Sequence, residues 1–207
     1  MTKTRSFVTL AVATVDIQAN EHGSHSAISH LAAIALLIAD RDAAGAWTFT
    51  LKCHAVAAGH GEDALLLWAL NALPTSGIVL GWQLADGIVA PLLDAATVGD
   101  SNIGRAFLDL LSRLVTAPSV DLAARHGGAG APALAEVVAR HGIKAASADQ
   151  AEIESAWAVG NLAWLREQVG AEAIAVWQLW LAESNGTARE ASAAFDAWLA
   201  AHRDLSA

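Results

Sequence analysis

Asp16 and Gln18 are the residues of this sequence whose types and spacing most clearly suggest chemistry. Asp16 follows an apolar run, Phe7–Val15, that predicts a buried strand. Side chains two residues apart on a strand point to the same side of a sheet, so two carboxylates with this spacing can reach one metal ion. Gln18 stands where the second carboxylate would be, and it offers a carbonyl oxygen without a charge. The pair therefore predicts a metal-binding strand end that has lost part of its charge.

The composition indicates a single domain that does not span a membrane. The chain has 207 residues, of which 55% are hydrophobic, and no run reaches the roughly eighteen uninterrupted apolar residues of a membrane span. Its one cysteine, Cys53, allows no intramolecular disulfide, and we expect a buried thiol in a cytoplasmic protein. The net charge of −9 counts against nucleic-acid binding, because such binding gains affinity by neutralising phosphates.

The first half of the sequence predicts three strands in succession, then a helix and a fourth strand. Apolar runs rich in aromatic and β-branched residues indicate the strands, and a polar turn at residues 40–45 separates the second from the third. An apolar face that ends just before Pro74 indicates the helix. The expected strands are residues 7–15, 28–39, 46–56 and 78–82, and the expected helix is residues 62–73.

Helices dominate the second half, so the whole layout predicts the mixed α/β class. The expected elements are helices at 86–96 and 101–115, a strand at 118–122, a helix from Pro132 to about Gly142, a long helical region at 152–183 broken near Gly170, and a last helix from a Thr187 cap to about His202. Four tryptophans in the long helical region have spacings typical of one helical face, and we expect them to pack in the core. They are Trp157, Trp164, Trp177 and Trp180.

Three blocks of sequence, in this order, resemble segments of the DEDD 3′–5′ exonucleases, and in particular of the bacterial proteins related to the exonuclease domain of family-B DNA polymerases. The blocks are Gly81-Trp82-Gln83 with Pro91-Leu92-Leu93, then Leu134–Ile143, and then Trp157–Asn161 through Trp180-Leu181. The resemblance covers residues 7–183 of a single domain, with a further helix at 187–203. It implies a ribonuclease-H-like mixed sheet, with three antiparallel strands followed by βα units and a helical C-terminal region.

In that family four carboxylates hold two divalent metal ions, here Mg²⁺ or Mn²⁺, that hydrolyse the terminal phosphodiester. The resemblance implies that Asp16 is the first carboxylate and that Gln18 replaces the second. The third falls on Ile88, although Asp86 lies two residues earlier, and the fourth falls on Glu172. Asp16, Gln18, Asp86 and Glu172 are thus the expected catalytic set. Because about two formal charges are missing, we expect a slow or inactive enzyme.

The same resemblance implies metal ligands and substrate contacts. Asp16 and Glu172 would hold the metal ion, and Gln83 and Gln168 would contact the 3′ end of a single-stranded DNA or RNA. The family's Tyr or His before the last carboxylate falls on Gln168 or on Glu167.

Other interpretations remain open from the sequence. The chain can be a non-catalytic scaffold that binds a protein partner through its tryptophan-rich C-terminal helices. It can instead be a metalloprotein that uses His22, His25 and His30, although these residues fall in a segment that the sequence predicts to be a loop. Asp86 can serve as a helix cap, and Glu172 can be an ordinary exposed helical charge.

Overall fold

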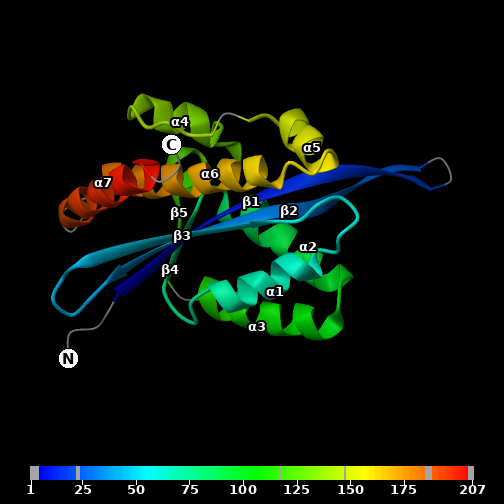
Figure 1. Cartoon of the computed structure of the whole chain (residues 1–207), viewed down its shortest axis with the longest axis horizontal. Helices are drawn as coiled ribbons and strands as arrows, with labels where there is room; N and C mark the ends of the chain where they lie inside the picture. Colours follow the sequence, from blue (N-terminus) through cyan, green and yellow to red (C-terminus); the bar gives the residue numbers. More distant parts are fainter. Residues whose placement is uncertain (1–4, 22–23, 117, 147, 185–187, 205–207) are drawn as a thin grey trace.

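The computed structural model describes residues 5–21, 24–116, 118–146, 148–184 and 188–204. The strands of these residues form a five-stranded sheet in the order β3-β2-β1-β4-β5, with a layer of helices on each face (Figure 1). Strand β2 is antiparallel to β1 and β3, whereas β4 is parallel to β1 and to β5. The strands are β1 (Arg5–Glu21), β2 (Ser24–Arg41), β3 (Trp47–Ala55), β4 (Ile78–Gly81) and β5 (Ser119–Asp121). The predicted mixed α/β class is confirmed.

One helical layer covers the sheet with aliphatic side chains. It consists of α1 (Asp63–Ala72), α2 (Ala90–Val98) and α3 (Ser101–Thr116). These helices bury Leu65, Leu66 and Phe107 against Val8 and Leu10 of β1. Helix α3 crosses α2 so closely that a Cβ on Gly104 would lie 2.1 Å from the carbonyl oxygen of Ala96.

The other layer is built around α6, and its contact with the sheet is aromatic. It consists of α4 (Leu134–Arg140), α5 (Gln150–Ala158), α6 (Leu162–Glu183) and α7 (Ala188–Asp204). Helix α6 contacts β1, β2 and β3, and its Trp177 is fully buried. We use the name aromatic cluster for the side chains of β1, β3 and α6 whose ring centroids lie within 6.2 Å of one another in a connected group: Phe7, Trp47, Phe49, Trp177 and Trp180.

The first two strands are longer than the sequence predicts. Strand β1 continues beyond Val15 to Glu21, and its pairing with β2 reaches from Arg5 and Arg41 to Glu21 and Ser24. Figure 1 shows this hairpin extending past the helices at one end of the sheet. Polar residues can continue a strand here because antiparallel pairing satisfies the backbone groups without a buried face. The predicted histidine loop is therefore wrong, since His25 and His30 lie in β2, and His22 is outside the described residues.

Two helix boundaries also differ from the prediction. The long helical region breaks at Val159–Asn161, where Gly160 has a φ of 73°, and not at Gly170. Gly170 lies inside α6, where a Cβ would come 3.0 Å from the Cys53 sulfur. A glycine at this position lets α6 lie close to β3, so its cause is packing rather than a helix end.

The expected helix at 86–96 begins earlier, as a π-helical turn, η1 (Leu84–Val89), that continues into α2. Its N-cap is Gln83, in the left-handed region with a φ of 49°, so the alternative that Asp86 caps this helix is wrong. The expected strand at 118–122 is the shorter β5, and Thr187 lies outside the described residues. In the described part of the chain, the helices include none with the length and apolar character needed to cross a membrane.

Candidate functional site

A pocket of about 430 Å³ opens between β1, α4, α5 and the N-terminal half of α6. Its position follows from the strand register. Strand β1 pairs with β4 only from Phe7 to Thr9. The residues of β1 that follow Thr9 are therefore not paired with β4, and they run beneath α6. Val12 and Ala13 of β1 form the floor, and Leu165 and Val169 of α6 form one wall. We call this cavity the α6 pocket.

Gln168 and Glu172 are the polar side chains that α6 contributes to the α6 pocket. They lie one helical turn apart, so both are on the same face of the helix. Neither side chain has a hydrogen-bond or ion-pair partner among the described residues. Burial raises the pKa of Glu172 from 4.5 to about 7, because removal from water disfavours the charged carboxylate. The pocket thus holds one carboxyl group that is partly protonated at neutral pH.

Ala11 and Ala13 occupy the positions of β1 from which an Asp-x-Glu pair could reach Glu172. Both alanines pack in the core that α6 covers, and Ala13 lines the α6 pocket. Alternate residues of a strand share a face, so these two positions point toward α6 together. Asp16 lies further along β1, past an irregularity in pairing between Ala13 and Thr14, and its side chain is exposed. It is not among the residues that line the pocket.

The region of the expected third carboxylate is also apolar. Ile88 is 4% exposed and packs in the aliphatic layer on the opposite side of the sheet from α6. Asp86 is exposed on η1, and Gln83 is half-buried at its start. Within the described residues, there is no group of three or more His, Cys, Asp or Glu side chains that could hold a metal ion.

The structure therefore brings together only part of the expected site. Gln168 and Glu172 line one pocket, whereas Asp16, Asp86 and Gln83 do not line it. The side chain of Gln18 is outside the described part of the chain. On the face of β1 that α6 covers, this chain has the methyl side chains of Ala11 and Ala13.

Two further acidic residues line the α6 pocket, and the sequence analysis passed over both. Glu136 is exposed in the first turn of α4, and Asp149 is the N-cap of α5. The spacing of Asp149 and Glu152 could have identified the cap, because a capping box joins an N-cap side chain to a Glu three residues later. The described lining residues include no lysine or arginine.

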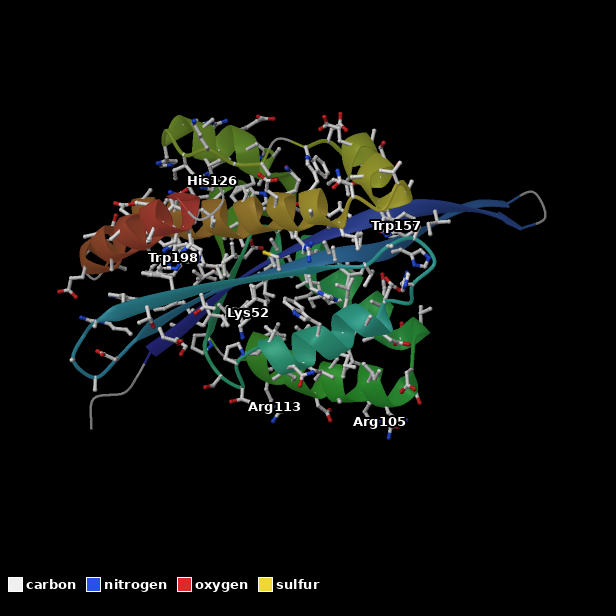
Figure 2. The ribbon with its side chains drawn as sticks, in the orientation of Figure 1. Lys52, Arg105, Arg113, His126, Trp157 and Trp198 are labelled. Carbon is white, nitrogen blue, oxygen red and sulfur yellow. The ribbon has the colours of Figure 1, made fainter. Side chains whose placement is uncertain are left out.

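A second charged group lies at the other end of α6. Glu183 accepts a hydrogen bond from Arg125 Nη1 at 3.2 Å, and its other oxygen lies 2.6 Å from His126 Nε2. The His126 ring in turn packs on Trp82 at 5.5 Å between centroids. Figure 2 shows His126 on the same side of the sheet as α6, whereas Arg105 and Arg113 lie on the opposite side, on α3. This group joins α6 to the short helical turn η2 (Leu122–His126) that follows β5.

The alternatives from the sequence receive little support from these contacts. His30 lies 3.8 Å from Glu62, and the side chains of His22 and His25 are outside the described part of the chain. Trp177 and Trp180 pack inward in the aromatic cluster, and so they do not form an exposed docking surface. No protein-family model matches the sequence, and no curated protein matches it.

Proposed function

We propose that this protein is a non-catalytic ribonuclease-H-like domain of exonuclease ancestry, in which the former active-site cavity has become a binding pocket. The proposal accounts for both the layout of the sheet and the chemistry of the α6 pocket. Three antiparallel strands followed by two parallel ones are the arrangement that the resemblance implies. Helix α6 places Gln168 and Glu172 over β1, where the family's last motif would lie.

The inference that catalysis is lost rests on the side chains found where the carboxylates would lie. Ala13 and Glu172 line the same pocket, and Ile88 is buried in the aliphatic layer. Two-metal hydrolysis needs several carboxylates to hold both cations and to orient the attacking water. Glu172 has a pKa of about 7, and the β1 position that lines the pocket with it is an alanine, so the site lacks the carboxylate charge that two metal ions need.

The test is hydrolysis of a 5′-labelled single-stranded oligonucleotide in Mg²⁺ and then in Mn²⁺, with protein shown to be folded by circular dichroism. We expect no shortening from the 3′ end with either ion. Glu172→Ala and Asp16→Ala are the controls. Shortening by the wild type that disappears in either variant would contradict the proposal and would support the second candidate, a slow exonuclease built on the surviving carboxylates.

The ancestry can be tested separately by returning a carboxylate to the pocket. Ala13→Glu should place a second carboxylate beside Glu172 and create Mn²⁺ binding that electron paramagnetic resonance detects. The Ala13→Glu, Glu172→Gln double variant should not bind Mn²⁺. Equal Mn²⁺ binding by the single and the double variant would show that the restored residue does not share a site with Glu172.

A further inference from the structure

We propose that the α6 pocket binds an ammonium group carried on a short apolar chain, with Glu172 and Gln168 as its acceptors. This inference rests on the proposed function, because it takes the pocket to be a binding site and not a catalytic one. It adds the chemical class of the ligand.

The polar groups of the pocket call for a hydrogen-bond donor. The Glu172 carboxyl and the Gln168 amide have no partner in the described part of the chain, although both face the cavity. Both side chains are half-buried, so a ligand that donates hydrogen bonds to them can replace part of the hydration that they have lost. An ionised carboxylate only accepts hydrogen bonds, and the amide oxygen one helical turn away is a second acceptor. An ammonium group has three donors and can satisfy both.

The charge of the lining favours a cation over an anion. Glu136 and Asp149 add two carboxylates at the pocket, and none of its described lining residues is a lysine or arginine. Asp149 accepts a hydrogen bond from the Glu152 backbone N–H through Oδ1, and its negative charge adds to the field at the pocket. A phosphate or carboxylate ligand would meet like charge here, whereas a cation would meet opposite charge.

The walls of the pocket suit a short hydrocarbon chain. Ala13, Ile153, Leu165 and Val169 line the cavity with aliphatic side chains. Its volume of about 430 Å³ falls in the range of about 300–1,000 Å³ that is typical of small-molecule sites. A methylene chain can therefore bury its surface while its ammonium end reaches Glu172.

Binding should also release a proton from Glu172. Burial holds the pKa of this carboxyl at about 7, so part of the population is protonated near neutral pH. A cation in contact favours the ionised form and lowers the pKa. A neutral ligand of the same shape would not have this effect.

The experiment compares n-butylamine with 1-butanol, its neutral isostere, by NMR titration and by calorimetry at pH 7 in two buffers of different ionisation enthalpy. We expect butylamine to bind at least tenfold more tightly than butanol and to release protons. Glu172→Gln should weaken butylamine at least tenfold and abolish the proton release. Glu167→Gln, which removes the same charge from α6 outside the α6 pocket, should change the affinity less than twofold.

Two outcomes would overturn the inference: equal binding of butanol, or unchanged butylamine binding and proton release in Glu172→Gln. A peptide with one lysine, beside the same peptide acetylated on that lysine, identifies the source of the ammonium group. Tighter binding of the lysine peptide than of butylamine, lost on acetylation, would indicate a protein side chain, and tighter binding of butylamine would indicate a small metabolite amine. Failure of amine binding without 3′ shortening would contradict this inference alone, whereas 3′ shortening lost in Glu172→Ala would contradict the proposed function.

Discussion

The two halves of α6 differ in how they use the same sheet. The C-terminal half is packed solid by the aromatic cluster, in which the Trp177 ring lies 4.7 Å from Trp180 and 5.7 Å from Phe49. The N-terminal half leaves a pocket over the alanines of β1. The C-terminal half fixes the position of α6 on the sheet. The N-terminal half can therefore hold polar side chains that do not stabilise the fold.

Glu172 and Glu183, which lie about three turns apart on α6, show this difference. Glu183 has Arg125 and His126 as partners, whereas Glu172 has none among the described residues. Glu172 can lack partners here because the aromatic cluster holds the other half of α6 on the sheet. In physical terms, the stability gained in one half offsets the desolvation of Glu172 in the other.

The largest expected loss of stability comes from a substitution in the packed C-terminal half of α6. Trp177→Ala should lower the free energy of unfolding by about 3–5 kcal/mol, because it deletes a fully buried ring and leaves a cavity. Urea denaturation followed by circular dichroism measures it. Trp177→Phe should cost much less, because it keeps an aromatic ring and removes an indole N–H that has no partner. Similar losses in the two variants would show that the ring is not what holds α6.

The next largest loss of stability should come from replacing Glu183, the glutamate that has partners. Glu183→Ala should cost about 2–3 kcal/mol, because it breaks the ion pair with Arg125 and the contact with His126 Nε2 of a side chain that is 13% exposed. Glu167→Ala, at an exposed position of the same helix, is the control and should change the free energy of unfolding by less than about 0.5 kcal/mol. If Glu183→Ala is as mild as the control, the contact between α6 and η2 is not a source of stability.

Replacing the unpartnered Glu172 should raise the free energy of unfolding, and it should do so only at higher pH. The folded pKa of Glu172, about 7, lies above the ordinary value of 4.5, so the folded state binds more protons than the unfolded chain between these two pH values. The contribution of this group to stability is therefore complete below about pH 4.5 and is lost as the pH rises to about 7. Glu172→Gln cannot ionise, and it should be more stable than the wild type by roughly 3 kcal/mol at pH 8.

Thermal unfolding of both proteins across this range measures the difference, which should vanish near pH 4.5. A stability difference that is the same at pH 4.5 and pH 8 would contradict a desolvated Glu172. The difference between the two proteins isolates Glu172 from the other carboxylates, which titrate in both.

The smallest effect concerns an unpartnered hydroxyl in β1. Thr9 is fully buried, and its Oγ1 has no hydrogen-bond partner among the residues that the structure describes. It alternates with Val8 and Leu10, and so shares the side of β1 that carries Phe7 and Ala11. Thr9→Val should raise the free energy of unfolding by about 1 kcal/mol, because it replaces a buried hydroxyl with a methyl of similar size. Urea denaturation that shows a loss of stability would mean that the hydroxyl has a partner in solution.

Local patterns predicted the class of the fold and most of its elements. The aromatic and β-branched residues of β3 and the apolar face of α1 that ends before Pro74 were enough for both elements. The end of the hairpin could not be predicted, because polar residues beyond Asp16 pair through backbone groups alone. Gly170 was misinterpreted as a helix end, because its cause is the approach of α6 to Cys53 in another element.

The candidate site shows the same limit. Gln168 and Glu172 could be found from the sequence, since both lie on one helix at a fixed spacing. The β1 positions that face Glu172 could not, because they depend on the register between Phe7 of β1 and Ile78 of β4. The sequence therefore directed attention to the first charged residue after the strand, Asp16, instead of the alanines beneath α6.

The close approach of α6 to Cys53 gives the protein an internal reporter of its own motion. Cys53 is the single cysteine, and burial raises its thiol pKa to about 11, so the reactive thiolate is scarce while α6 is in place. Cys53 is half-buried, so an alkylating reagent should react slowly while α6 is in place and faster in transient openings in which α6 leaves β3. The labelling rate at fixed pH should therefore rise when this contact loosens, and a ligand that stabilises α6 on β3 should lower it.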